Sequence, residues 1–199
     1  MLKIYTMNVS GIDTADEGIY ESLSERRREK VKKLKNERAK KQSIGAELLL
    51  ITAVSEETGK KEAPVKWDCG EFGKPYLADY PDIHINIAHS GDYAVCAVSD
   101  TEIGTDIQYM REFNEAVMRR CFTAEETELV KSAADKKDAF YDLWVRKESF
   151  AKAVGRGLLL PLNEISVIND RITYDGNDYS FIKQDFNDKM YKLCLCKCI

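Results

Sequence analysis

Hydrophobic and polar positions alternate along the first residues of the chain and then recur every three or four residues. Residues 2–10 (LKIYTMNVS) alternate as in a β-strand, whereas residues 21–35 and 36–59 have the apolar spacing of α-helices. Gly59 is a residue type that commonly ends a helix. Three short apolar runs then predict strands, at residues 63–67, 83–90 and 93–99.

The second half of the pattern runs in the same order. Residues 101–110 predict a strand that forms a hairpin with residues 93–99 around Asp100. Thr123 and Glu126, three positions apart, are typical of a capping box at a helix start. The predicted helices are 115–122, 123–133 and 136–155, the last being the longest. The closing strands are 164–169 and 171–176, which meet near Asn169, then 179–186 and 189–199.

Each half of the chain therefore contains a strand, then helices, then antiparallel strands. This order without strict alternation predicts an α+β fold. We expect a pseudo-twofold pair of similar halves, residues 1–99 and 100–199, each with an antiparallel sheet packed on helices. No linker rich in Pro, Gly or Ser separates them, so we expect an active site in the cleft between two tightly packed halves.

Composition places the chain among globular proteins. Its 199 residues are enough to bury a core, and 44% are hydrophobic while 32% are charged. The first residues lack the basic and apolar regions of a signal peptide, and no apolar run is long enough to span a membrane. These features predict a soluble, cytoplasmic protein that does not act in a membrane.

Charge is distributed unevenly along the chain. The net charge is -4, yet residues 25–41 contain ten Lys or Arg against three Glu, which gives this segment +7 and leaves -11 elsewhere. One interpretation is a solvated amphipathic helix; the other is attraction to a polyanion, either a phosphate-rich small molecule or a nucleic acid. A nucleic-acid binder would not explain the acidic remainder of the chain.

Three of the six cysteines alternate near the end of the chain. Cys194, Cys196 and Cys198 would point to one face of a strand, where reduced cysteines behave as small hydrophobic residues. A zinc site is the alternative, but the spacing differs from the usual two-residue gap between ligands.

Two clusters of residues could carry chemistry on regular elements. In GTDIQ, Asp106 and Gln108 point the same way from a strand and could hold Mg²⁺, although a plain polar strand face explains them as well. In WVRKESFAKAVGRG, Glu148 and Lys152 lie one helical turn apart beside Trp144. Such a pair is usually an exposed ion pair, but this helix is largely apolar, so we expect the charges to have specific partners.

A third cluster lies between the predicted strands of the first half. Lys74 and Pro75 follow Gly73 in a turn, and His89 and Ser90 end a strand. Backbone amides, a hydroxyl, an imidazole and an ammonium together could hold a phosphate group. The chain contains neither the G-x-S-x-G nucleophile motif nor a P-loop or dinucleotide fingerprint.

Taken in order, GKP, NIAHS, GTDIQ, FTAEE and WVRKESFAKAVGRG resemble the motifs of the Sfp-type 4′-phosphopantetheinyl transferases. The resemblance extends from about residue 23 to residue 161. It implies an enzyme that moves the phosphopantetheine arm of coenzyme A onto a serine of an apo acyl or peptidyl carrier protein and releases adenosine 3′,5′-bisphosphate. It also implies a pseudo-dimeric fold in which coenzyme A and Mg²⁺ occupy the cleft.

The same resemblance assigns roles to single residues. The magnesium residues would be Asp106, Gln108 and Glu148, and Lys152 would contact the diphosphate of coenzyme A. Glu126 would act as a catalytic residue beside Glu148 and Lys152 by taking the serine proton. The remaining coenzyme A contacts would be Lys74, Pro75, His89, Ser90 and, for the 3′-phosphate, Lys41 among the basic residues of segment 25–41.

The sequence departs from the family pattern at two positions. Gln108 stands where many members have Glu, which predicts weaker magnesium binding. Gln42 stands where an arginine is frequent, so the neighbouring Lys40 or Lys41 would take over the 3′-phosphate contact. Two other functions remain open: a Mg²⁺-dependent diphosphate or phosphodiester hydrolase of a nucleotide, and a non-catalytic homologue that binds coenzyme A or a carrier protein. We expect the carrier near residues 112–122, and a monomer, because one chain supplies both halves.

Overall fold

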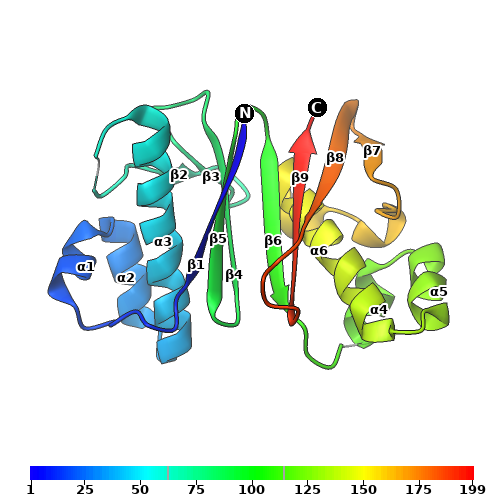
Figure 1. The fold of residues 1–199 in the computed structure, drawn as a ribbon. Helices are drawn as coiled ribbons and strands as arrows, with labels where there is room; N and C mark the ends of the chain where they lie inside the picture. The colour runs from blue at the N-terminus through cyan, green and yellow to red at the C-terminus, as the bar shows by residue number, and fades with distance from the viewer. Residues whose placement is uncertain (62, 114) are drawn as a thin grey trace.

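The computed structural model describes residues 1–61, 63–113 and 115–199, and its elements form two groups along the chain (Figure 1). The first group contains β1 (Leu2–Asn8), α1 (Glu17–Ser22), α2 (Glu25–Lys33), α3 (Glu37–Thr58), β2 (Asp68–Cys69), β3 (Pro75–Tyr76), β4 (His84–Ser90) and β5 (Tyr93–Ser99). The second contains β6 (Ile103–Tyr109), α4 (Glu115–Cys121), α5 (Ala124–Ser132), α6 (Lys136–Val154), β7 (Arg171–Tyr174), β8 (Asn177–Gln184) and β9 (Tyr191–Cys198). Two short 3-10 turns, Gly157–Leu159 and Leu162–Glu164, follow α6.

Each group packs a long helix against an antiparallel sheet. Strands β1, β5 and β4 form a three-stranded sheet in that order, and β6, β9, β8 and β7 form a four-stranded sheet. Figure 1 shows α3 outside the first sheet and α6 against the second, with the two sheets facing each other across the middle of the molecule. Strands β2 and β3 form a separate short pair. The predicted α+β class is confirmed.

The helices begin and end at residues with clear capping roles. Ser24 accepts a hydrogen bond from the amide of Arg27 and starts α2, so the helix predicted over 21–35 is divided into α1 and α2. Gly59 ends α3 with a φ of 70°, a left-handed conformation that suits glycine. At 22 residues α3 is longer than α6, which has 19, so the expectation that α6 is the longest helix was wrong; the predicted bounds 36–59 and 136–155 already imply the observed order.

Three strand predictions were wrong. Strand β5 pairs with β1 and β4, whereas β6 pairs with β9, so the expected hairpin around Asp100 is instead a connection between two sheets. Residues 63–67 form no strand; the strand in that region is β2. Residues 164–169 form no strand either, because carbonyl oxygens of this segment accept hydrogen bonds from α6 side chains instead of from a neighbouring strand. The closing hairpin turns at Asp175 and Gly176, whose φ angles are positive.

Side chains join the two sheets where β4 faces β6. Asn86 Oδ1 accepts a hydrogen bond from the amide of Thr105 at 2.9 Å, and Ser90 Oγ accepts one from the amide of Tyr109 at 3.0 Å. An apolar cluster with members from both sheets lies along the same contact: Ala88, Val95, Ile107, Tyr191 and Leu193. The two halves are thus packed together through a common buried surface, which we call the inter-sheet contact.

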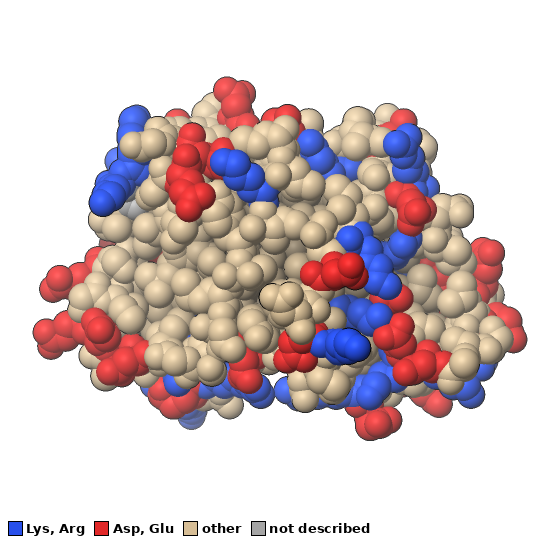
Figure 2. Space-filling view, in the orientation of Figure 1, with Lys and Arg blue, Asp and Glu red and all other residues tan. Residues whose placement is uncertain are grey.

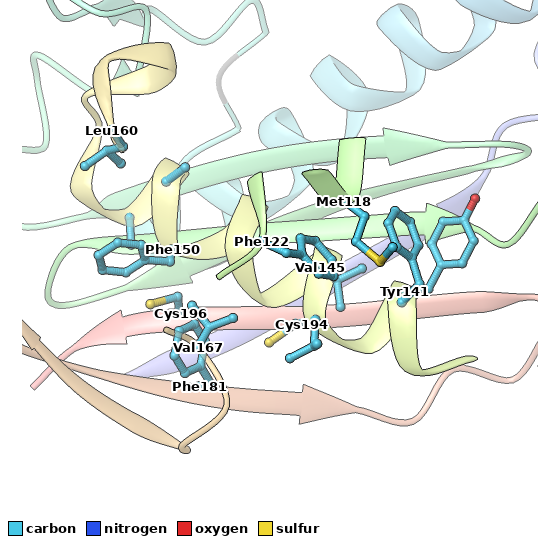
Figure 3. Close-up of a cluster of buried hydrophobic side chains, with 14 of the residues drawn as sticks. Met118, Phe122, Tyr141, Val145, Phe150, Leu160, Val167, Phe181, Cys194 and Cys196 are labelled. Carbon is cyan, nitrogen blue, oxygen red and sulfur yellow. The ribbon is translucent and has the colours of Figure 1, made fainter. Parts of the chain in front are cut away.

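The largest core cluster lies between α6 and the four-stranded sheet (Figure 3). Figure 3 shows Val145 and Phe150 of α6 near Cys194 and Cys196 of β9, and all four belong to this cluster. Both thiols are free and at most 1% exposed, and Cys198 packs against the same cluster. The prediction that these cysteines share one face as small hydrophobic residues is confirmed.

The surface carries mixed charge on the face seen in Figure 2. Basic and acidic side chains lie there in neighbouring groups, and much of the area over the first sheet is uncharged. Several charged side chains form ion pairs, including Lys183 with Asp142 and Lys192 with Asp138. Among the described residues, no helix has both the length and the apolar character needed to cross a membrane.

Candidate active site

The centre of the candidate site is the place where β6 touches α6. A Cβ atom on Gly104 would lie 2.0 Å from the carbonyl oxygen of Ser149 and 2.4 Å from the amide nitrogen of Ala153. Both are backbone atoms of α6, so only a residue without a side chain allows this close approach. Asp106, two positions further along β6, is thereby brought against the last turns of α6.

Asp106 and Lys152 form an ion pair at this contact. Lys152 Nζ lies 2.6 Å from Asp106 Oδ1 and donates to the carbonyl oxygen of Thr105 at 3.0 Å. Gln108 Nε2 donates to Asp106 Oδ2 at 2.9 Å. Asp106 is only 3% exposed, and this burial raises the pKa of its carboxyl, while the Lys152 ammonium and the Gln108 amide oppose the rise.

Glu148 completes an acidic pair with Asp106. It is half-buried on α6, one turn before Lys152, and faces the main cavity. Its pKa is raised, first by burial and then by the negative charge of Asp106, while Lys152 lowers it. Asp106, Glu148 and Lys152, predicted to act together, are therefore brought together, and a bound cation would relieve the repulsion between the two carboxylates.

A cavity of about 810 Å³ opens beside these charges. Lys74, Pro75 and Asn86 of the first half line it together with Glu148 and Lys152 of the second. The rest of its wall is largely apolar and includes Ala116, Val117, Cys121, Trp144, Ala151, Leu160 and Leu162. The cavity thus combines a charged group of residues with an apolar wall, and both halves of the chain contribute to it.

Lys74 connects the loop before β3 to the end of α6. Its Nζ donates to the carbonyl oxygen of Ala153 at 2.7 Å and pairs with Glu102. Burial lowers the pKa of Lys74, and the ion pair with Glu102 opposes that change. A Cβ atom on Gly155, which ends α6 with a φ of 75°, would lie 3.0 Å from Lys74 Cδ. The lysine stem therefore packs closely over the helix end.

A smaller pocket of about 320 Å³ adjoins the cavity and shares Gly73, Pro75 and Ile87 with it. Its remaining lining is rich in basic and aromatic side chains: Arg26, Arg27, Lys30, Trp67 and His89. The guanidinium carbons of Arg26 and Arg27 lie 5.0 and 5.3 Å from the Trp67 ring centroid. We refer to this as the basic pocket.

A buried ion pair orients α2 toward the basic pocket. Arg27 Nε lies 2.7 Å from Glu47 Oε2 on α3, and Arg27 Nη1 donates to Ser43 Oγ at 3.1 Å. Glu47 Oε1 also accepts from the amide of Ser24, the residue that caps α2. These bonds fix the rotation of α2, and Lys30, one turn after Arg27, lines the basic pocket as a result.

Like charges lie close together in the basic pocket. Burial lowers the pKa of Lys30, with further contributions from Arg27 and Arg26. Burial also lowers the pKa of His89 to about 4, with smaller contributions from Lys30 and Lys152. The His89 imidazole is therefore neutral at pH 7, and the surrounding positive charges would be compensated by a bound anion.

Two residues predicted to bind coenzyme A lie elsewhere. Lys41 Nζ donates to the carbonyl oxygen of Ser10 at 2.6 Å, and Ser90 accepts its bond from Tyr109 in the inter-sheet contact. Neither residue lines the cavity or the basic pocket. Segment 25–41 is divided by a helix break, so Lys41 on α3 and the basic residues of α2 face different surroundings.

Glu126 does not have the surroundings of a general base. It is 0% exposed, and its Oε2 accepts from the amide of Thr123 at 2.8 Å and pairs with Lys147 at 2.7 Å. Its Oε1 accepts from the amide of Val167 at 2.8 Å. The predicted capping box is therefore confirmed, but the carboxylate is enclosed and lines neither the cavity nor the basic pocket, so we withdraw the predicted proton-accepting role.

Several residues that line the basic pocket were not predicted from the sequence. Some residues of the range 112–122, which were expected at the surface, are buried. Arg26, Lys30 and Trp67 line the basic pocket, and of these only the two basic residues had a signal, the charge of segment 25–41. In the range 112–122 proposed for carrier binding, Met118 and Phe122 are core residues. Residue 114 of that range lies outside the described part of the chain.

The acidic pair fits one kind of metal. Among the described residues, no three His, Cys, Asp or Glu side chains gather in a way that could hold a metal ion. Mg²⁺, however, is usually bound by one or two carboxylates together with substrate phosphates and water. Asp106 and Glu148 match that donor set, whereas Gln108 uses its amide as a donor to Asp106.

Comparison with known proteins agrees with these features. A model described as "4'-phosphopantetheinyl transferase, N-terminal" matches residues 16–101, and one described as "4'-phosphopantetheinyl transferase superfamily" matches residues 102–193. A 4'-phosphopantetheinyl transferase of Bacillus subtilis is 34% identical over 184 residues, which cover 88% of this chain and 82% of the relative.

Two further relatives extend the comparison. The 4'-phosphopantetheinyl transferase Sfp of Bacillus subtilis (strain 168) is 31% identical over 185 residues, 87% of this chain and 81% of the relative. The L-aminoadipate-semialdehyde dehydrogenase-phosphopantetheinyl transferase of Mus musculus is 32% identical over 154 residues, 69% of this chain and 50% of the relative. The two family models meet where the chain passes from β5 to β6, between the two sheets. The chain belongs to the 4′-phosphopantetheinyl transferase family.

Proposed function

We propose that this protein transfers the 4′-phosphopantetheine arm of coenzyme A to a serine of an apo carrier protein and releases adenosine 3′,5′-bisphosphate. The observation that carries the proposal is the joining of a basic pocket to a partly apolar cavity with Asp106, Glu148 and Lys152 beside it. Coenzyme A has the same three chemical parts: a phosphorylated nucleoside, a diphosphate and a long, mostly uncharged arm.

The chemistry of the lining suggests how the substrate lies. The 3′-phosphate would bind among Arg26, Arg27 and Lys30, with neutral His89 available as a hydrogen-bond partner. The arm would lie against the apolar wall of the cavity near Trp144. The diphosphate would then lie between these sites, next to Lys152.

Attack on a diphosphate requires that its charge be neutralised and that the incoming hydroxyl lose its proton. Lys152 would contact the phosphate oxygens, and Asp106 and Glu148 would hold Mg²⁺, which supplies further charge neutralisation when bound. With Glu126 enclosed, Glu148 is the carboxylate placed to accept the serine proton, because it lines the cavity.

Location and oligomeric state belong to the same proposal. All six cysteines are free thiols, which supports a reducing compartment such as the cytoplasm. Both halves of one chain line the cavity, which supports a monomer acting on coenzyme A and a carrier protein. The mixed charge of the face in Figure 2 offers no broad basic surface there for nucleic acid.

Intact-mass spectrometry of an apo carrier protein tests the proposal. Incubation with the enzyme, coenzyme A and Mg²⁺ should add the mass of one phosphopantetheine arm, and the gain should disappear with Glu148→Ala or without metal. Glu128→Ala, at an exposed position of α5, is the matched control and should keep full activity. Coenzyme A cleaved without carrier modification would favour a hydrolase. Coenzyme A bound but unchanged with several carriers would favour a non-catalytic binder.

A further inference from the structure

Lys147 is a charged residue of α6 with no task in the proposed reaction. It lies inside the motif of residues 144–157, yet its side chain is 0% exposed. Its ammonium pairs with Glu126 at 2.7 Å and donates to the carbonyl oxygens of Leu162, at 2.6 Å, and Ile165. All three of its protons are therefore used inside the protein.

Glu126 binds the same segment, residues 162–167, through the carboxylate oxygen that does not pair with Lys147. Its Oε1 accepts from the amide of Val167, so the pair bonds three backbone groups between residues 162 and 167. This segment contains one 3-10 turn and no strand, and thus lacks the ladder bonds that fix a sheet. Figure 3 shows Leu160 and Val167 in the core beside Phe150 of α6. The buried pair therefore replaces regular structure in fixing the segment.

The segment held in this way is part of the cavity wall. Leu160, Leu162 and Asn163 line the cavity, and so does Glu148, the residue next to Lys147 on α6. Successive helical residues project about 100° apart, so one turn of α6 anchors the wall with Lys147 and presents Glu148 to the cavity. The distance between the cavity wall and the Glu148 carboxylate is thus determined by two adjacent residues of α6.

Stability alone does not account for this pair. Burying two charges is expensive, and an apolar pair of similar volume is often as stable. An apolar pair could not, however, bond the carbonyl groups of Leu162 and Ile165 or the amide of Val167, and buried backbone groups without partners are costly. The ion pair selects one position of the wall, which an apolar contact would leave less defined.

We propose that Lys147 is a positioning residue that, together with Glu126, holds the wall formed by residues 160–163 at the separation from Glu148 that the pantetheine arm requires. The inference rests on the proposed function, since it places the arm in this cavity. The pair acts through the wall and touches no substrate itself. It therefore governs recognition of the arm and leaves recognition of the nucleotide to the basic pocket.

Calorimetric titration with coenzyme A and with adenosine 3′,5′-bisphosphate separates recognition of the arm from recognition of the nucleotide. The double variant Lys147→Met/Glu126→Gln avoids leaving a buried carboxylate unpaired. Its Kd for coenzyme A should rise about tenfold, the factor expected for the loss of a buried hydrogen bond. Its Kd for adenosine 3′,5′-bisphosphate, which lacks the arm, should stay unchanged. In steady-state assays the KM for coenzyme A should rise in parallel, and Lys147→Arg, which keeps the charge, should recover part of the loss.

Arg146→Met provides the matched control. Arg146 is the neighbouring cation, and it bonds the carbonyl groups of Val167, Ile168 and Asn169, beyond the residues that line the cavity. Its loss should leave the ratio of the two Kd values at the wild-type level. The proposal would be overturned if the double variant raised the Kd values of both ligands by the same factor. It would also be overturned if the variant left both Kd values unchanged.

Hydrogen exchange on the wild-type enzyme decides the matter if the double variant does not fold. The proposal requires the amide of Val167 to exchange slowly before any ligand is added, because Glu126 already holds it. Fast exchange that slows only with coenzyme A would show that the ligand, and not the pair, sets the wall. A wild-type enzyme that binds neither ligand would instead refute the proposed function.

Discussion

At the scale of single residues, Glu148 is a carboxylate whose ionised form the folded protein disfavours. Burial and the charge of Asp106 raise its pKa above that in an unfolded chain. Between the unfolded and folded pKa values the folded state binds more protons, so the stability contributed by this group falls as pH rises through that window. Below the unfolded pKa the group is protonated in both states and contributes no difference.

Glu148→Gln should therefore stabilise the metal-free protein at neutral pH while it abolishes transfer. We expect a gain of about 1 kcal/mol in the free energy of unfolding at about pH 7, which disappears below about pH 4. Urea denaturation with a chelator present measures the unfolding free energy at each pH. Glu128→Gln, at an exposed site, should show no such pH dependence. A variant less stable than the parent at neutral pH would contradict the assignment of an unfavourable buried charge.

In the proposed magnesium site, Gln108 sets how much negative charge a bound metal would meet. Its amide donates to Asp106 Oδ2 at 2.9 Å, so the site contains two carboxylates and one neutral neighbour. Gln108→Glu adds a third carboxylate, which should tighten Mg²⁺ binding by about tenfold, a gain of about 1.4 kcal/mol. Calorimetric titration with Mg²⁺ measures this directly, and Gln184→Glu adds the same charge on β8 as a control. An unchanged magnesium affinity would count against a metal at this position.

Some residue roles were predictable from local spacing and others were not. The separation of Thr123 and Glu126 was enough to predict the capping box, because both partners lie within one turn. The role of Glu126 depends also on Lys147, which is distant in sequence and reaches it only through the packing of α5 on α6. A carboxylate in a motif therefore does not reveal whether water can reach it.

At the scale of elements, the approach of β6 to α6 depends on a single glycine. Gly104→Ala would place a methyl group against the α6 backbone at Ser149 and Ala153, which cannot move aside as a flexible side chain would. We expect a loss of about 1–3 kcal/mol in unfolding free energy, and about a hundredfold lower kcat/KM because Asp106 and Lys152 would be displaced. Urea denaturation and steady-state kinetics measure the two effects.

Gly11→Ala is the control for this substitution. Apart from Gly11 and its chain neighbours, no heavy atom in the described part of the chain lies within 4 Å of the Cβ position there, and Gly11 is not among the glycines with a positive φ. Its stability and kcat/KM should match those of the parent. Full activity in Gly104→Ala would show that the close helix–strand contact is not needed to place the charged residues.

The positions of the helices and strands were easier to predict than the pairing of the strands. The pattern of residues 101–110 correctly predicted a strand, because alternation reports which positions are buried. The same pattern cannot report which edge a strand joins, and β6 pairs with β9, far away in sequence, rather than with β5. Likewise, the apolar residues of 164–169 suggested a strand, but the hydrogen bonds of that segment go to α6 side chains.

At the scale of the whole molecule, the inter-sheet contact makes the two halves depend on each other. Val95 of β5 and Ile107 of β6 are both 0% exposed and belong to one cluster. Separating the halves would expose this surface and leave Asn86 and Ser90 without their partners on β6. The cavity would also be lost, since each half supplies part of its lining. The halves should therefore unfold together.

The two tryptophans allow this prediction to be measured, because Trp67 lies in the first half and Trp144 in the second. Single-tryptophan variants, Trp67→Phe and Trp144→Phe, report on one half each, and after correction for their own stabilities their transitions should coincide with that of circular dichroism. Ile107→Ala should lower the unfolding free energy by about 2–4 kcal/mol and shift both tryptophan transitions equally. Leu159→Ala, at a position 71% exposed, should shift neither. If only the Trp144 transition moved with Ile107→Ala, the halves would be independent folding units and the inter-sheet contact merely a place where they touch.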